Sequence, residues 1–293
     1  MRNMAVPEQV KEERVAQEFL NRDLTWLEFN RRVLHEAVDN RTPLLERVRF
    51  LGIFTSNLDE FFMKRVGGLK RQIAAGVTVL TPDGMNQSQQ LASIREALTP
   101  MLATQATCFQ DKLIPALAEN GIHLLDYNAL TPIERDQARE YFDKSVFPVL
   151  TPLAVDPGHP FPFISNLSTS LAISMRHPDK EERLFARVKV PQVLPAWVRL
   201  PGTPQGPFRY ISLKDILQYH LGDLFPEMEL LQIMPFRITR NVELERDEDD
   251  AEDLLEMIEQ ELRDRRFART VRLEHGPQPD PWIRQFLMQA LEL

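Results

Sequence analysis

The stretch NRDLTWLEFNRRVL at positions 21–34 gives the clearest local fold signal in the sequence. Thr25 and Glu28 have the spacing of a capping box, in which the hydroxyl accepts from a first-turn N–H and the carboxylate bonds back to the cap residue. The spacing therefore predicts a helix that begins at Thr25. Its apolar face, which repeats close to every 3.6 residues, comprises Trp26, Phe29, Val33 and Ala37, widened by Leu34 and Val38.

Two further helix starts follow this stretch. Thr42 followed by Pro43 has the form of a cap and a first-turn proline, and predicts a helix over residues 44–54. Asn57 precedes the acidic pair Asp59 and Glu60, which the positive end of a helix dipole favours. Asn57 is therefore expected to cap a third helix that ends near residue 75.

A fourth helical element is expected after a Pro82-Asp83-Gly84 turn. Residues 89–119 are amphipathic and end at Asn120-Gly121, a typical helix stop. Because Pro100 and Pro115 each remove a backbone donor, we expect a kink or a boundary within this element. The first 120 residues thus predict an antiparallel bundle of about four helices.

The pattern changes after Gly121. Thr131-Pro132-Ile133-Glu134 predicts another helix, and strands are expected over residues 146–150, 171–175, 184–190, 208–211 and 236–240. The alternation in 184–190 is typical of a strand with one buried face. Proline-rich loops separate these runs, and helices are expected over 241–264 and 282–293.

These elements predict a multi-domain α and α+β protein, with an N-terminal antiparallel helical bundle followed by a mixed α/β head domain. We expect a polar tail at 1–20, a helical domain at 21–120 and a head domain at 121–293. Because no cap or polar tail follows the helix at 282–293, we also expect the head domain to be truncated there.

Composition excludes several classes of protein. Apolar residues make up 43% and charged residues 27% of the 293 residues, as in ordinary globular proteins. No apolar run is long enough to span a bilayer, and the first residues carry no signal sequence, so a cytoplasmic location is expected, with peripheral membrane attachment left open. The single cysteine, Cys108, excludes an internal disulfide, and we interpret it as a buried helix residue.

The net charge of −8 is unevenly distributed. Residues 241–264 hold twelve acidic residues and two arginines, a net charge of −10, whereas residues 41–80 hold seven basic and three acidic residues, a net charge of +4. The average charge therefore argues little against an anionic ligand. We interpret the acidic run as a solvated helix face, with metal binding as the minor alternative.

Motifs for catalysis are missing from the sequence. The sequence has six histidines, and none of them pair at metal-ligand spacing: His35, His123, His159, His177, His220 and His275. It also has no HExxH or GxSxG motif. The run Gly67-Gly68-Leu69-Lys70 lacks the spacing of a phosphate-binding loop and falls inside a predicted helix. Neither a metal site nor a catalytic residue is therefore predicted.

Basic residues cluster on the helix that Asn57 begins. They are Lys64, Arg65, Lys70 and Arg71, and the seven-residue spacing places Lys64 and Arg71 on a common helix face. This cluster fits either ordinary surface charge or an approach route for an anion such as a nucleotide or polyphosphate. Nucleic-acid binding through the same helix is a weaker alternative, which would show a steep dependence on salt.

Several longer motifs resemble type 1 polyphosphate kinases. The opening stretch is similar to the start of that family, and the likeness continues through PLLERVRFL at 43–51 and SNLDEFF at 56–62. It returns in FPVLTPLAVD at 147–156, HPFPFISNL at 159–167 and FRITRN at 236–241. The resemblance extends from about residue 20 to the end of the chain.

The resemblance implies an enzyme that reversibly transfers the terminal phosphate of ATP to polyphosphate through a phosphorylated histidine, with Mg²⁺. It implies that the phosphohistidine and the Mg²⁺ sites lie in later domains, outside this chain, so that the isolated chain would be inactive. It also implies a homo-oligomer formed through the head domain, for which the aromatic loop at 159–163 is expected to be exposed. His159 itself is interpreted as a structural loop residue.

One binding residue follows from the resemblance. Asn57 matches the asparagine of the family's Ser-Asn-Leu-Asp-Glu-Phe motif, which contacts ATP, and its amide offers both a donor and an acceptor to an adenine edge. The sequence leaves open whether Asn57 serves as ligand, helix cap or both. A non-catalytic binding or assembly module is the alternative function of the isolated chain.

Overall fold

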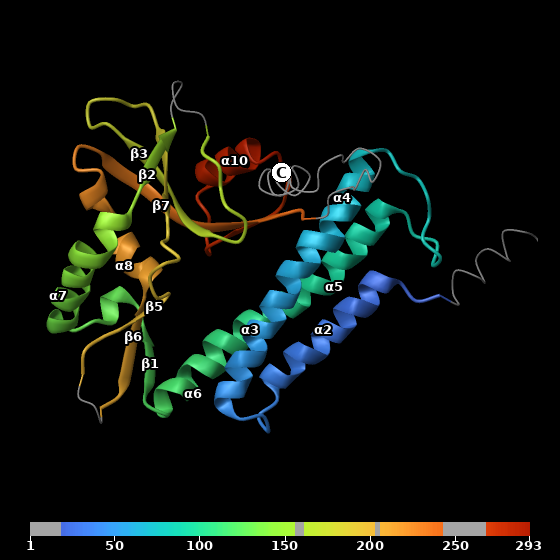
Figure 1. The fold of residues 1–293 in the computed structure, drawn as a ribbon, viewed down its shortest axis with the longest axis horizontal. Coiled ribbons are helices and arrows are strands. Elements are labelled where there is room, and N and C mark those ends of the chain that lie inside the picture. The colour runs from blue at the N-terminus through green and yellow to red at the C-terminus, as the bar shows by residue number, and fades with distance from the viewer. Residues whose placement is uncertain (1–18, 156–160, 203–205, 243–267) are drawn as a thin grey trace, which may run out of the picture. The chain divides into compact units, whose positions relative to one another are not determined.

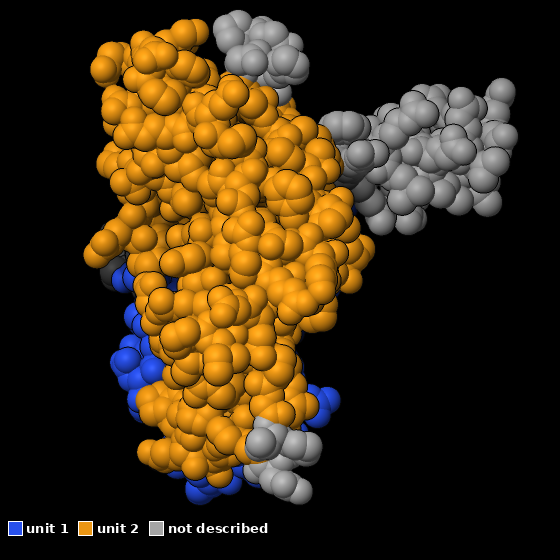
Figure 2. Space-filling model, turned by 90° about the vertical axis from the view of Figure 1, so that its left-hand side faces the viewer, with its two compact units in different colours: residues 1–113, 241–250 blue, residues 114–240, 251–293 orange. Residues whose placement is uncertain are grey.

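The computed structural model describes residues 19–155, 161–202, 206–242 and 268–293. Most of the tail at 1–20, His159 and nearly all of the expected acidic helix at 241–264 lie outside these ranges. The contacts divide the chain into two compact units (Figure 2). Unit 1 comprises residues 1–113 and 241–250, and unit 2 comprises residues 114–240 and 251–293.

The described residues of unit 1 form three long helical segments that lie side by side (Figure 1). Helix α2 packs against α3 and α5, and α4 packs against α5. The segments are α2 (Arg22–Val38); α3 (Leu44–Phe61) continued by the π-helical turn η1 (Phe62–Val66) and α4 (Gly67–Ala74); and α5 (Gln87–Thr107) continued by the π-helical η2 (Cys108–Leu113). The helical bundle is confirmed, but the second and third predicted helices are one.

The first helix starts earlier than predicted. Asn21 is the N-cap, and its Oδ1 accepts from the N–H groups of Asp23 and Leu24 at 3.0 and 3.1 Å. Thr25 lies inside the first turn, where its hydroxyl donates to the Asn21 carbonyl at 2.8 Å. The predicted Thr25 cap is wrong because asparagine caps at least as well and occurs one turn earlier.

The second segment contradicts two predicted caps. Helix α3 begins at Leu44 as expected, but Pro43 occupies the cap position and Thr42 bonds to Glu36 instead. Asn57 is not a cap, because it lies within α3 and its amide bonds to a neighbouring helix. The backbone ladder therefore continues past Asn57, and the segment ends at Ala74, close to the predicted end.

The third segment begins with a capping box between Asn86 and Gln89. It passes through η2 into α6 (Ile114–Glu119), and Gly121 follows with a φ of 77°, as a left-handed helix stop requires. The irregular π turn precedes Pro115, which cannot donate to the carbonyl of Asp111. The expected irregularity is found near Pro115, while the helix around Pro100 stays regular.

The buried stripe of α2 is rotated from the predicted one. Leu27, Asn30, Leu34 and Ala37 are buried, whereas Phe29 is 49% exposed. Asn30 occupies a core position that is missed when the buried face is predicted from apolar residues alone. The core of unit 1 is completed by large side chains from α3 and α5, including Phe54, Leu58, Phe61, Ile94, Leu98 and Met101.

The described part of unit 2 contains two sheets and four helices besides short turns. A five-stranded antiparallel sheet has the order β2-β4-β3-β7-β8, and a three-stranded sheet has the order β1-β6-β5, with β1 parallel to β6. The strands are β1 (Ile122–Leu125), β2 (Pro152–Val155), β3 (Thr169–Arg176), β4 (Leu184–Lys189), β5 (Trp197–Arg199), β6 (Phe208–Ser212), β7 (Glu229–Arg240) and β8 (Thr270–His275). Besides α6, the helices are α7 (Pro132–Tyr141), α8 (Leu213–Tyr219) and α10 (Pro281–Ala290). Short helical turns are η3 (Tyr127–Ala129), η4 (Phe142–Val146), η5 (Phe147–Val149) and η6 (Leu221–Leu224).

Both faces of the five-stranded sheet are covered (Figure 1). Helices α7 and α8 pack on one face and α10 packs on the other. Phe185 and Arg187 are therefore 2% and 5% exposed, so the prediction that only one face of this strand is buried is wrong. The alternation separates two buried layers, not core from solvent.

Most other elements of unit 2 agree with the sequence. The Thr131 capping box opens α7, and the strands expected at 171–175, 184–190, 208–211 and 236–240 are found within or close to the observed bounds. The strand expected at 146–150 is wrong, because the helical turns η4 and η5 occupy it. The mixed α/β head domain is confirmed. Among the helices described, none has the length and apolar character needed to cross a membrane.

Candidate functional site

The candidate site in unit 1 begins with a buried asparagine on α2. Asn30 is 0% exposed, and its Nδ2 donates to the Phe54 carbonyl of α3 at 3.2 Å. Because a carbonyl can only accept, this bond fixes which end of the Asn30 amide is the donor. The Oδ1 of Asn30 must therefore be the acceptor for whatever lies next to it.

Asn57 is that neighbour. Its Nδ2 donates to Asn30 Oδ1 at 2.9 Å, so the chain of two bonds also fixes the orientation of the Asn57 amide. Asn57 is only partly buried, and its Oδ1 has no hydrogen-bond partner within the described residues. The amide therefore presents its carbonyl oxygen and its second N–H to an incoming group.

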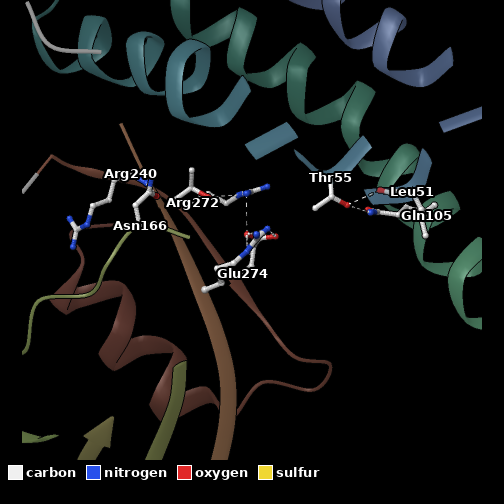
Figure 3. A network of polar contacts seen from close by, with 9 residues as sticks. Leu51, Thr55, Gln105, Asn166, Arg240, Arg272 and Glu274 are labelled. Carbon is white, nitrogen blue, oxygen red and sulfur yellow. Dashed lines mark hydrogen bonds and ion pairs between the residues drawn. The ribbon is translucent and has the colours of Figure 1, made fainter. Parts of the chain in front are cut away.

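Rigid packing surrounds this amide. Phe54 and Leu58 on either side of it are buried, and Trp26 stacks on Phe61 with ring centroids 4.7 Å apart. On the face toward α5, the Gln105 Nε2 donates to the Thr55 hydroxyl at 2.6 Å (Figure 3). Helix α3 is thus fixed against both neighbouring helices, which limits the motion of Asn57.

Of the four predicted basic residues, the first two have acidic neighbours. Lys64 pairs with Glu60 at 2.5 Å, and Arg65 lies 3.7 Å from Asp23. Both lysine and glutamate of the first pair are more than half exposed. Exposed pairs of this kind contribute little to stability, so Lys64 can turn toward an anion at small cost.

The other two basic residues lie beyond the π turn. Lys70 is exposed and Arg71 is partly buried, both on α4. Since a π turn holds more residues than an α turn, the π turn η1 changes the angle between Lys64 and Arg71 from that of a regular α-helix. The common face of Lys64 and Arg71 stays a prediction, and all four residues belong to the same continuous helix as Asn57.

A close contact lies beside the π turn. A Cβ placed on Gly67 would lie 2.5 Å from the Asn241 Oδ1, and the Val242 N–H donates to the Met63 carbonyl at 3.1 Å. Residues 241 and 242 are thus held against the helix that carries the basic residues. The run Gly67–Lys70 is helical, as the sequence predicts.

Cys108 and His220, two other residues with reactive side chains, are both enclosed by the protein. Cys108 is 1% exposed and contacts the Ala37 carbonyl, which confirms it as a buried helix residue. His220 is buried, and its ring nitrogens face the Tyr127 hydroxyl and the Arg139 guanidinium. Within the described ranges, no three His, Cys, Asp or Glu side chains gather so that they could hold a metal ion.

The described part of the aromatic loop also differs from expectation. Phe161 is partly buried, and its ring lies 5.9 Å from Phe185 and 6.1 Å from Phe286. Phe163 is also partly buried, below the Arg240 guanidinium at 5.0 Å. For the described part of the loop the expected exposure is wrong, because Phe161 packs against the core of unit 2 and Phe163 lies below Arg240.

Asn30 is the residue of this candidate site that sequence patterns alone did not identify. It is spaced three residues after Leu27 and four before Leu34, so its place on the buried stripe was detectable. A polar residue at such a position needs a partner from another element. That requirement was the available signal, but the partner, Asn57, is visible only in the fold.

Comparison with known proteins matches the chain to two known domains of one family. Residues 19–125 match the family model described as the polyphosphate kinase N-terminal domain, and residues 133–293 match the polyphosphate kinase middle domain. The chain is 49% identical to a polyphosphate kinase of Thermosynechococcus vestitus over 281 residues and 50% identical to one of Synechocystis sp. over 283 residues. Each match covers 94% of this chain.

A solved structure agrees with these matches. The polyphosphate kinase of Porphyromonas gingivalis has a TM-score of 0.76 and 26% sequence identity, over 94% of this chain and 38% of that chain. The helical bundle and the mixed α/β unit are thus the folds of two known domains. The chain belongs to the type 1 polyphosphate kinase family. It spans 38% and 39% of the length of the two curated relatives.

Proposed function

We propose that this chain supplies the nucleotide-contacting part of an ATP:polyphosphate phosphotransferase, which reversibly transfers the terminal phosphate of ATP to polyphosphate. Asn57 contacts the adenine ring in this proposal. The observation that carries it is the fixed orientation of the Asn57 amide, which follows from its 2.9 Å bond to the buried Asn30. Family membership supports the choice of ATP as the nucleotide.

On the N7 edge of the base, the chemistry of the amide favours adenine over guanine. An adenine edge offers an amino donor next to a ring-nitrogen acceptor, which matches the free carbonyl oxygen and N–H of Asn57. The N7 and O6 of guanine are both acceptors, so the carbonyl oxygen of Asn57 would face another acceptor. Because Asn30 holds the amide, Asn57 does not rotate freely to suit guanine.

The basic residues have a supporting role in the proposal. Lys64, Arg65, Lys70 and Arg71 raise the local positive potential along the same helix. Such a potential increases the rate at which a polyanion arrives more than it increases specific affinity. Nucleic acid would feel the same attraction, but no observation favours it over nucleotide and polyphosphate.

The covalent chemistry is assigned outside this chain. We attribute the phosphohistidine and the Mg²⁺ sites to other domains of the full enzyme, and no Mg²⁺ ligand is assigned to the described residues. The isolated chain is therefore expected to bind nucleotide without turnover, as a non-catalytic module. Assembly into a homo-oligomer through unit 2 is part of the proposal on family grounds alone.

Titration of the 293-residue chain with ATP and GTP tests the nucleotide contact. ATP should bind more tightly than GTP, and Asn57→Ala should weaken ATP binding about tenfold, as expected for loss of a bidentate contact. Gln105→Ala is the matched control, because it removes a polar contact of the same bundle without touching Asn57. Equal ATP affinity in the wild type and Asn57→Ala would remove Asn57 from the site. ATP-dependent polyphosphate synthesis by this chain would contradict the module role.

A further inference from the structure

Three cationic side chains of unit 2 meet at one short loop. The Arg187 Nη1 donates to the Phe163 carbonyl at 3.2 Å, and the Arg240 Nε donates to the Ile164 carbonyl at 3.1 Å. Lys189 Nζ lies 3.4 Å from the Ser165 hydroxyl oxygen. We call these three cations together with residues 163–165 the loop cation cluster. Every acceptor in these three bonds is a neutral oxygen.

Arg187 is the most unusual member of the cluster. It is 5% exposed, its Nε donates to the Ser170 hydroxyl at 3.1 Å, and its buried Nη2 has no hydrogen-bond partner within the described residues. Burial lowers the pKa of Arg187, but a guanidinium keeps its proton in proteins. A buried charge without a counter-charge is costly, so the site is suited to receive an anion.

Other arginines of unit 2 have their positive charge balanced by a carboxylate. Arg209 pairs with Glu134, Arg176 with Glu229 and Arg237 with Glu274, at 2.5 to 2.8 Å. Arg187, Lys189 and Arg240 make no ion pair of this kind in the part of the chain that the structure describes. The carbonyl and hydroxyl oxygens that these three cations meet supply no negative charge to balance them.

The sheet holds the cluster in place. Arg187 and Lys189 lie two residues apart on β4, and the β3 register puts Lys189 opposite Ser170. Arg240 ends β7, where its N–H donates to the Asn166 Oδ1 at 2.8 Å (Figure 3). Lys189 and Ser165 are partly exposed, so the cluster opens to solvent on their side. Its donors need little rearrangement to meet a ligand.

We propose that the loop cation cluster binds a phosphate-type oxyanion, either inorganic phosphate or a phosphate group of a polyphosphate chain. A tetrahedral oxyanion carries several acceptors for Lys189, for the Ser165 hydroxyl and for the Nη2 of Arg187. The site lies in unit 2 and shares no residue with the Asn57 site. It does not depend on the proposed nucleotide contact.

The test is titration of the 293-residue chain with inorganic phosphate at constant ionic strength. Lys189→Met removes the exposed cation, and Arg187→Lys keeps the charge but removes the forked donors. Lys144→Met is the matched control, since Lys144 is an exposed lysine of the same unit with a carboxylate partner, Glu140. Each variant is compared with the wild type in phosphate affinity and in melting temperature without phosphate.

Lys189→Met and Arg187→Lys are expected to weaken phosphate binding about tenfold or more, while Lys144→Met and Asn57→Ala leave it unchanged. Lys189→Met should melt within a few degrees of the wild type, so a loss of binding cannot be ascribed to unfolding. A parallel loss for polyphosphate identifies the chain as the source of the anion, and a loss for phosphate alone identifies the free ion. Equal phosphate affinity in Lys189→Met and the wild type, or no binding by the wild type, overturns the proposal.

Discussion

Gly67 and Asn241 lie so close together that a Cβ at position 67 would overlap the Asn241 side chain unless that side chain moved. A Cβ on Gly67 would lie 2.5 Å from the Asn241 Oδ1 and 2.7 Å from its Cγ. Since Asn241 is itself buried, its side chain has little room to move away. The glycine therefore serves close packing, although it lies in a helix where alanine has the better intrinsic propensity.

This contact makes the Gly67→Ala substitution informative. We expect it to destabilise the protein by about 1–3 kcal/mol, as overpacking does. Gly52→Ala is the paired control, because Gly52 lies inside α3 and a Cβ added there would meet no described atom within 4 Å. That substitution should stabilise by about 0.5–1 kcal/mol through helix propensity. Chemical denaturation measures both, and stabilisation by Gly67→Ala would show that Asn241 is not held there.

Asn30 is predicted to act on nucleotide binding without touching the nucleotide. Asn30→Ala removes two buried hydrogen bonds and should cost about 2 kcal/mol of folding stability. Because the Asn57 amide then loses its fixed orientation, discrimination of ATP over GTP should fall as well.

Thr55→Val provides the control for Asn30→Ala. It removes the hydroxyl that bonds to Leu51 and Gln105, so stability should drop by about 1 kcal/mol while nucleotide discrimination is retained. ATP and GTP affinities are measured for both variants. If Asn30→Ala keeps full discrimination, Asn30 is only a core residue and its bond to Asn57 has no role in binding.

The lowered pKa of Glu134 leads to a prediction of how the free energy of unfolding changes at acid pH. Its hydrogen bonds with Arg209 lower its pKa from 4.5 to about 2, and those with Thr131 act in the same direction. Because the folded-state pKa is lowered, the stabilisation is present above about 4.5 and is lost as pH falls toward 2. We expect about 2 kcal/mol, allowing for screening at the partly exposed Arg209.

Unfolding free energies measured between about pH 6 and pH 3 test this prediction. Glu134→Gln should be less stable at the upper end of this range and should lose less stability on acidification than the wild type. Glu140→Gln is a suitable comparison, since Glu140 is an exposed acid of the same helix. Parallel pH profiles for Glu134→Gln and the wild type would contradict the assignment.

The buried His220 leads to a second prediction of how stability depends on pH, in a range above that of Glu134. Burial lowers the pKa of His220 below 6.5, and the nearby Arg139 guanidinium adds to this, while Asp223 and Asp143 oppose it. The unfolded chain then binds the proton more readily than the folded one. The contribution of His220 to the free energy of unfolding should therefore be constant above about pH 6.5 and should fall as the pH drops below that value.

His220→Gln should remove the decline in stability between about pH 6.5 and pH 5, even if it lowers stability at about pH 7.5. His35→Gln replaces an exposed histidine and serves as the control. The measurement is the melting temperature across this range in buffers of equal ionic strength. A wild-type curve that stays flat, or a decline retained in His220→Gln, would be inconsistent with a buried neutral imidazole.

The sequence predicts elements well where the signal is local. Thr131 and Glu134 form their capping box within four residues, and α7 begins where they indicate. The strand signals within β3, β4 and β7 are also local, since β-branched and aromatic residues favour extended backbone. The helical bundle and the mixed α/β unit could therefore be predicted, and the family motifs agreed with both.

Sequence patterns mislead where tertiary contacts decide. Asn57 has every local feature of a helix cap, but a partner 27 residues away on α2 takes its amide. Phe185 and Arg187 alternate with apolar residues, but α10 covers the face that alternation assigns to solvent. The identity of Asn57 as a candidate could be read from the motif, whereas its orientation could not, because Asn30 determines it.

The nucleotide contact is tested most directly by NMR of the ¹⁵N-labelled chain. The signal observed is that of the Asn57 side-chain amide itself. Its resonance is assigned from the cross-peak that disappears in Asn57→Asp. We predict that this resonance shifts saturably during titration with ATP and shifts far less with GTP. A resonance that does not respond to ATP, while other residues of the chain do, would show that Asn57 does not contact the nucleotide.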